Sequence, residues 1–231
     1  MKNIITINKV IPVNLVQTLL REVKKGGYHS EYEYDRHRLI ISDTEGQNEL
    51  SLRLPINFLL NEQREHKANE ENHYIILLIQ AGSCAMGLFN NDIVEDHKVY
   101  KSYMVRKKQG KSQIKYLNAK GKSRAGSRVR LSNTIDFFEN INERLQQYFD
   151  EHSVNRIALS CSKTILPFLY NSKVNCPFDK KDARLYKIPK HIPSPGYDVL
   201  MGTHRFLLKA DVTYKEPHTN FASELLKDHL Q

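Results

Sequence analysis

The chain contains the stretch YIILLIQAGSCAMGLF at residues 74–89, in which two apolar runs flank a short break. The first run, residues 74–79, is continuously apolar and is typical of a strand in the centre of a sheet. The second run, residues 84–89, follows Ala81-Gly82-Ser83, a spacing that favours a tight hairpin. Apolar and polar residues alternate over residues 97–106, which predicts another strand. The stretch and its continuation therefore predict three strands in hairpin order.

Helices and strands are expected to alternate after this sheet. Ser132, Asn133 and Thr134 can all cap a helix, and apolar residues recur at helical spacing from there to residue 151. Three strands followed by a helix and a strand is the element order of ribonuclease-H-like domains, although other α/β folds share it. The further predicted elements are a strand at 156–160, a helix at 163–170, a strand at 203–214 and a helix at 222–230.

The beginning of the chain predicts a separate, small α+β unit. Residues 12–25 carry one apolar stripe that starts at Pro12 and stops at Gly26-Gly27, which indicates a helix. Two strand-like runs, 31–42 and 49–54, flank the turn signal of residues 43–46.

The almost wholly polar residues 61–72 predict a linker. We therefore expect an N-terminal α+β unit at 1–68 and a second domain at 69–231. The fold class expected for the whole is α/β (α+β). It comprises a ribonuclease-H-like mixed sheet with flanking helices and a long basic loop, preceded by the small unit.

Composition excludes several classes of protein. Apolar residues make up 40% of the 231 residues, with 12 Tyr and 9 Phe, which predicts a folded chain rather than a disordered basic tail. No apolar run reaches the length of a membrane span, and the first residues lack the features of a signal peptide, so we expect a cytoplasmic protein. Cys84, Cys161 and Cys176 are widely spaced and predict reduced, partly buried thiols.

The basic segment, residues 101–130, carries the excess positive charge of the chain. It contains eleven Lys or Arg and no Asp or Glu, whereas the formal net charge of the whole chain is +9. A single-signed field of this density favours a polyanionic partner such as nucleic acid. Glycines, including Gly110 and Gly121, allow close approach of the backbone to a phosphate chain. Tyr116 suits stacking on a base, or packing of the segment onto the domain.

The spacing of residues excludes several other motifs of functional sites. Gly110-Lys111-Ser112 and Gly121-Lys122-Ser123 resemble the end of a P-loop, but Val105 and Tyr116 stand where that motif needs glycine. The ten histidines form no recognisable ligand pattern, and Ser83 lacks the surroundings of a nucleophile elbow. The sequence therefore predicts neither a metal site nor a bound cofactor.

The run Tyr103–Gln113, YMVRKKQGKSQ, followed by Asn118-Ala119-Lys120-Gly121 and Ala125-Gly126-Ser127, resembles one specific family. These are the Vms-type release-factor-like (VLRF) proteins, peptidyl-tRNA-releasing enzymes of ribosome quality control. They are related to the catalytic domain of the eukaryotic class-one release factor. The resemblance extends over about residues 74–214. The zinc finger, ankyrin repeats and tail of the eukaryotic members have no counterpart here, which indicates a bacterial version.

The resemblance implies a ribosome-rescue factor that releases the nascent peptide from peptidyl-tRNA on a stalled large subunit. The release would proceed by cleavage of the tRNA near its CCA end or by ester hydrolysis. The implied protein acts in the cytoplasm as a monomer, without metal, cofactor, DNA or membrane. A different interpretation is a non-catalytic ribosome- or tRNA-binding factor that has kept the basic segment for docking. A third is an unrelated RNA-binding domain.

The resemblance also assigns roles to residues of the basic segment. The tip residues Gly110, Ser112 and Gln113 are expected to be catalytic. Gln113 would position water or a ribose hydroxyl, because an amide cannot act as a general base. Lys111 departs from the Gly that many relatives have in the tip. The expected RNA contacts are Arg106, Lys107, Lys108, Gln109, Lys111, Lys115, Tyr116, Lys120, Lys122, Arg124, Arg128 and Arg130.

Overall fold

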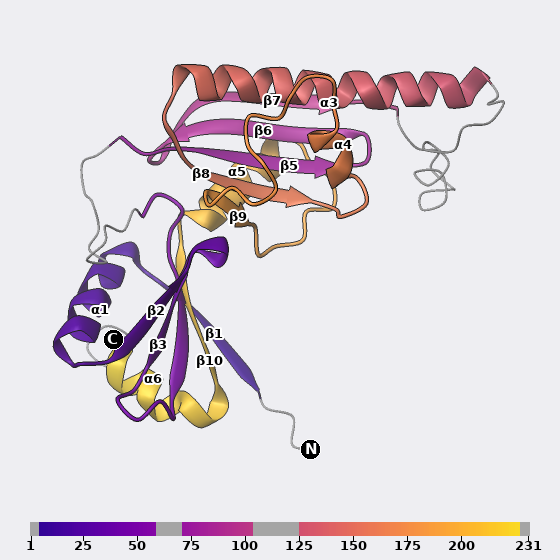
Figure 1. Ribbon diagram of the computed structural model, residues 1–231. Helices are drawn as coiled ribbons and strands as arrows, with labels where there is room; N and C mark the ends of the chain where they lie inside the picture. The colour runs from indigo at the N-terminus through magenta and orange to yellow at the C-terminus, as the bar shows by residue number, and fades with distance from the viewer. Residues whose placement is uncertain (1–4, 59–70, 104–124, 227–231) are drawn as a thin grey trace. The chain divides into compact units, whose positions relative to one another are not determined.

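The computed structural model describes residues 5–58, 71–103 and 125–226, and side chains are described only from residue 131 onward in the last range. The chain is an α+β protein with two five-stranded sheets, each in its own compact unit. Unit 1 comprises Met1–Glu71 and His204–Gln231, and unit 2 comprises Asn72–Thr203. Figure 1 shows both sheets with their helices.

Unit 1 contains an antiparallel sheet in the order β1-β10-β4-β3-β2. Its core joins Val16 and Leu19 of the first helix with apolar side chains from the sheet and from the last helix. The elements are β1 (Thr6–Ile11), α1 (Val13–Lys25), β2 (His29–Glu33), η1 (Tyr34–Arg36), β3 (Arg38–Ser42), β4 (Glu49–Arg53), β10 (Ala210–Lys215), η2 (Glu216–His218) and α6 (Thr219–Leu226).

The local sequence explains several of these elements. Helix α1 follows Pro12 and buries Val16, Leu19 and Val23, the stripe that predicted it. Strands β3 and β4 pair across the predicted turn, in which Gly46 adopts a positive φ of 70° and donates a hydrogen bond to the Asp43 carbonyl. The run at 31–42 is not one strand. It spans part of β2 and the whole of β3, with η1 and the positive-φ residue His37 between them.

The second expected domain, 69–231, needs a correction at its C-terminal end. Strand β10 pairs with β1 and β4 of unit 1, and α6 packs into the core of that unit. Residues 204–231 therefore belong to unit 1. The predicted strand at 203–214 is correct only in its second part, because helix α5 extends over Tyr197–Leu207. Leu200, Thr203 and Leu207 are buried at helical spacing, which explains the helix.

Unit 2 contains a mixed sheet in the order β7-β6-β5-β8-β9. Strands β5, β6 and β7 pair antiparallel as consecutive hairpins, and β8 then pairs parallel to β5. The crossover between β7 and β8 contains helix α3, which runs along one face of the sheet (Figure 1). The elements are β5 (His73–Gln80), β6 (Ser83–Asn90), β7 (Ile93–Lys101), α3 (Ala125–Glu151), β8 (Val154–Cys161), α4 (Leu166–Tyr170) and β9 (Leu185–Lys187), before α5.

The apolar run at 74–79 forms the central strand, as predicted. Every residue from Tyr74 to Ile79 is fully buried, because neighbouring strands pair with both edges of β5 and its two faces are covered. Phe138, Ile141 and Leu145 of α3 pack against Ile75 and Leu77. The two-residue β5–β6 turn requires Gly82, whose φ is 83°. The α+β class is confirmed, and the ribonuclease-H-like assignment remains a prediction.

Candidate functional site

The basic segment leaves unit 2 at the end of β7 and returns in α3. The backbone N–H of Ser102 donates to the Gly82 carbonyl over 2.9 Å, and its hydroxyl donates to the Asn133 carbonyl over 3.0 Å. The amide of Asn133 donates to the carbonyl of Tyr103 over 3.3 Å. The two ends of the segment are thus joined to each other and to the β5–β6 turn.

The predicted catalytic residues Gly110, Ser112 and Gln113 lie outside the described residues. The same holds for the expected RNA contacts up to Arg124. Arg128 and Arg130 belong to helix α3, where the structure describes the backbone. Their roles therefore stay predictions. The contacts outside the described residues are Arg106, Lys107, Lys108, Gln109, Lys111, Lys115, Tyr116, Lys120, Lys122 and Arg124.

The structure corrects the expected start of the helix. Helix α3 begins at Ala125, whereas the capping residues at 132–134 predicted a start there. Thr134 is fully buried, and the side chain of Asn133 connects the helix to Tyr103, which follows β7. The residues of α3 before Asn133 extend the helix by about 12 Å. Figure 1 shows α3 continuing beyond the end of the sheet.

The surface around the ends of the basic segment is itself positive. Strands β5, β7, β8 and β9 all end on this side of the sheet. The described residues at these ends and directly after them, 80–83, 101–103, 162–172 and 187–197, include no Asp or Glu. We call this surface the strand-end surface. Its exposed cations are Lys101, Lys163, Lys187 and Lys190.

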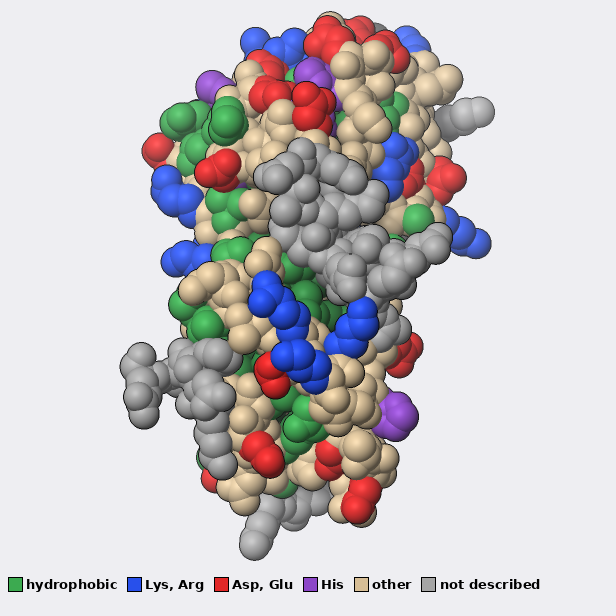
Figure 2. Space-filling view, turned by 90° about the vertical axis from the view of Figure 1, so that its left-hand side faces the viewer, with side chains coloured by type: hydrophobic (Ala, Val, Ile, Leu, Met, Phe, Trp, Pro, Cys, Tyr) green, Lys and Arg blue, Asp and Glu red, His purple; other side chains and the backbone are tan. Residues whose placement is uncertain are grey.

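The opposite end of the sheet carries acidic side chains. Asp92, Glu95 and Asp96 belong to the β6–β7 hairpin, and Asp150 and Glu151 end helix α3. Acidic side chains with histidine among them are visible in the upper part of Figure 2, which faces this side. Charge is therefore unevenly distributed over unit 2, and an RNA backbone would be attracted to the strand-end surface.

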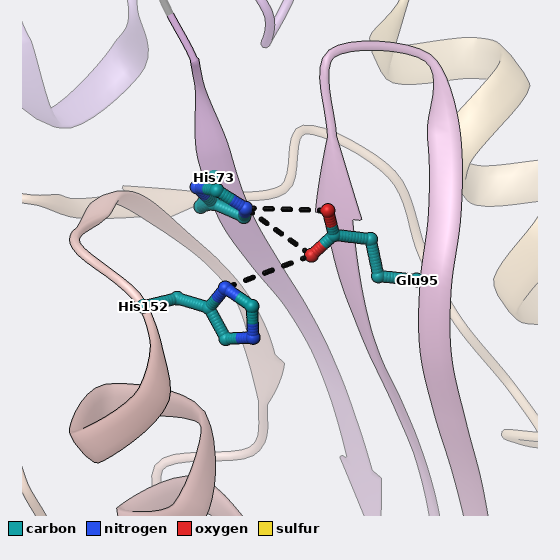
Figure 3. Close-up of side chains that lie close together, drawn as sticks. All are labelled: His73, Glu95 and His152. Atoms are coloured by element: carbon teal, nitrogen blue, oxygen red, sulfur yellow. Dashed lines mark hydrogen bonds and ion pairs between the residues drawn. The ribbon is translucent and has the colours of Figure 1, made fainter.

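Three side chains of this opposite end converge although they lie far apart in the sequence. His73, Glu95 and His152 place their ligand atoms within 4.8 Å of one another (Figure 3). The spacing of the ten histidines gave no sign of this group. The topology of the sheet brings these residues together, because the start of β5, the start of β7 and the end of α3 meet at the same end of the sheet.

The cysteines do not provide a nucleophile. Cys84 is fully buried and burial raises the pKa of its thiol strongly. Burial likewise raises the pKa of Cys161 to about 12 and that of Cys176 to about 11. All three are free thiols, as the sequence predicted. They stay protonated near neutral pH and are therefore poor nucleophiles.

Unit 2 of this α+β protein thus carries a polycationic segment next to the strand-end surface, and a positive field of this kind favours a polyanionic partner. The family model described as Bacteroidetes VLRF1 release factor matches residues 74–215 of the chain. The chain belongs to this family, so the resemblance inferred from residues 103–127 is confirmed.

The chain is also similar to a solved structure described as "Vms1 mitochondrial localization core". The identity is 11% and the TM-score is 0.44, over 89% of this chain and 82% of the other. None of the curated proteins matches the chain significantly. Within the part of the chain that the structure describes, no helix combines the length and apolar character needed to cross a membrane.

Proposed function

We propose that the chain releases nascent peptides from peptidyl-tRNA on stalled large ribosomal subunits in the cytoplasm, acting as a monomer. The observation that carries this proposal is the basic segment, with eleven cations and no acid, in a member of a release-factor family. The hydrogen bonds of Ser102 and Asn133 support it, because they fix the base from which the segment starts and to which it returns.

The fold and the surface charge give further support. Three antiparallel strands followed by a crossover helix and a parallel strand is the arrangement that a ribonuclease-H-like domain requires. Lys163, Lys187 and Lys190 extend the positive field of the basic segment onto the folded domain. A ribosomal RNA or tRNA backbone would be neutralised by both parts together.

The chemistry that we propose depends on Gln113. Its amide would orient either a water molecule toward the ester carbonyl or a ribose 2′-hydroxyl toward the adjacent phosphorus. In the second reaction the 2′-oxygen forms a bond to phosphorus and the 5′-oxygen leaves. The shortened tRNA then ends in a cyclic phosphate, and CCA stays on the peptide. Arg106, Lys107 and Lys108 would stabilise the phosphate charge.

The first experiment adds purified chain to stalled 50S–peptidyl-tRNA complexes and analyses both products. Free peptide with an intact tRNA 3′ end indicates ester hydrolysis, whereas peptide that carries CCA indicates tRNA cleavage. The paired change Lys107→Ala and Lys108→Ala should weaken binding and reduce its salt dependence. The matched control changes Lys24 and Lys25, two exposed lysines of α1, to Ala. Absence of any peptide release would contradict the enzymatic proposal.

Lys111 favours a second candidate function, a non-catalytic factor that binds stalled ribosomes. The extra charge and side chain at the tip distinguish this chain from many relatives of the family that it resembles. A binding factor would bind the 50S complex tightly and in a salt-sensitive way, and Gln113→Ala would leave that binding unchanged. Binding without release by the unchanged protein is the result that would favour this function over the first.

A further inference from the structure

A compact group of metal-ligand side chains lies at the end of unit 2 where strand β5 begins. His73 is the first residue of β5, Glu95 lies near the start of β7, and His152 directly follows α3. Figure 3 shows the two imidazoles and the carboxylate pointing toward one another. Three different elements thus contribute one side chain each to a common centre.

The distances within this group suit a small metal ion. The Nε2 of His73 lies 3.2 Å from Oε2 and 3.3 Å from Oε1 of Glu95. The Nδ1 of His152 lies 3.8 Å from the same Oε2. Tetrahedral Zn²⁺ with bonds of about 2.0–2.1 Å separates its ligand atoms by about 3.3 Å. Small side-chain rotations would therefore bring the three atoms to bonding distance.

The surroundings of His152 supply a further element of a metal site. Its other ring nitrogen, Nε2, lies 3.9 Å from the carboxylate of Glu151. A carboxylate that accepts a hydrogen bond from a ligating imidazole orients the ring and raises its basicity, and Glu151 would take this role after a small movement of its exposed side chain. The neighbouring Asp96 is already engaged, because it accepts a hydrogen bond from the Tyr148 hydroxyl and forms an ion pair with Arg144 at 2.8 Å. Glu95 is thus the carboxylate of this hairpin that turns toward the two imidazoles.

Solvent access is compatible with metal entry. The side chain of His73 is 9% exposed, while those of Glu95 and His152 are 28% and 27% exposed. Ions can therefore approach from the Glu95 and His152 side, and water can complete a four-coordinate shell.

We propose that His73, Glu95 and His152 bind one Zn²⁺ ion. Two imidazole nitrogens favour zinc over Ca²⁺ or Mg²⁺, which prefer shells made of oxygen. The ion would connect β5, β7 and α3. From Glu95 to Lys101, β7 extends about 20 Å toward the basic segment. The ion therefore stabilises unit 2 and takes no part in the release chemistry.

Tag-free full-length protein, freed of metal with EDTA, tests the site by calorimetric titration with Zn²⁺. We expect one ion per chain and a rise in Tm that EDTA reverses. Co²⁺ in place of Zn²⁺ should give the intense visible absorption of a four-coordinate ion. His73 is buried, so its substitution also affects folding. The more exposed positions therefore carry the test, as the changes His152→Ala and Glu95→Gln.

Each of these two changes should lower the affinity for Zn²⁺ by more than about a hundredfold. His191→Ala, at an exposed histidine outside the group, is the matched control and should leave the affinity unchanged. Absence of stoichiometric binding would overturn the proposal. So would binding that His152→Ala and Glu95→Gln leave intact, because the ion would then be held elsewhere.

Discussion

The hydroxyl of Ser102, the first residue after β7, donates a hydrogen bond over 3.0 Å to the backbone carbonyl of Asn133 in α3. The side chain of Asn133 returns a bond to the carbonyl of Tyr103. This reciprocal pair closes the base of the basic segment. These two bonds connect the residues that follow β7 to helix α3.

Removing this pair should lower both the stability of unit 2 and the rate of peptide release. We expect Ser102→Ala and Asn133→Ala each to lower the free energy of unfolding by about 1 kcal/mol. The double variant should release peptide severalfold more slowly, because the segment is positioned less well. Single-turnover release and urea unfolding measure the two effects. The control is Asn140→Ala, whose amide bonds only within α3 to the Asp136 carbonyl among the contacts described. Unchanged release by the double variant would contradict a positioning role.

Helix α3 is held to the sheet by its apolar face. Leu145 is fully buried in the core of unit 2. Leu145→Ala should therefore lower the free energy of unfolding by about 2–5 kcal/mol, through lost transfer energy and a cavity. The exposed neighbour Gln147 gives a control on the same helix, and its change to Ala should alter stability by about 0.5 kcal/mol or less. Circular dichroism in urea measures both, and a similar cost for the two variants would contradict this packing.

A buried ion pair connects β4 and β10 of unit 1. Arg53 and Asp211 are paired across the sheet, with side chains 7% and 14% exposed. Removal of one partner leaves a charge buried, so Asp211→Ala should cost about 3–5 kcal/mol in unfolding free energy. The exposed pair of Lys25 and Glu22 is the comparison, and Glu22→Ala should cost about 1 kcal/mol or less. Equal losses in thermal unfolding would show that burial of the pair is unimportant.

The thiols should react slowly at neutral pH. Because burial raises the pKa of Cys161 to about 12 and of Cys176 to about 11, only the small thiolate fraction reacts. The rate of iodoacetamide labelling should rise about tenfold per pH unit between pH 7 and 9. Mass spectrometry of the labelled protein, with free glutathione as the reference thiol, measures these rates. A cysteine that reacts as fast as glutathione at pH 7.4 would contradict the pKa values.

The elements that the sequence predicted well are those with a strong local period. The stripe of Val16, Leu19 and Val23 marked α1, and the continuous apolar run from Tyr74 marked the central strand. The pairing of β10 with β1 and β4 was not predictable, because it joins the two ends of the chain and leaves no local pattern. Ser132, Asn133 and Thr134 were misleading, since residues that cap helices also occur inside them, and the side chain of Asn133 finds its partner in Tyr103 after β7.

The two candidate sites also differ in how well the sequence predicted them. The basic segment was evident because its charge is contiguous in the sequence, and its family motif is contiguous too. The group of His73, Glu95 and His152 is assembled only by the sheet topology. A histidine at a strand start and another at a helix end carry no signal until the fold brings them together.

The rate of peptide release from stalled 50S–peptidyl-tRNA complexes, measured in single turnover with the unchanged protein and with Gln113→Ala, tests the proposed function most directly. We predict release by the unchanged protein and a rate about a hundredfold lower for Gln113→Ala, with similar binding to the 50S complex. Equal rates for the two proteins, or no release by either, would contradict the assignment of release to the tip at residues 110–113.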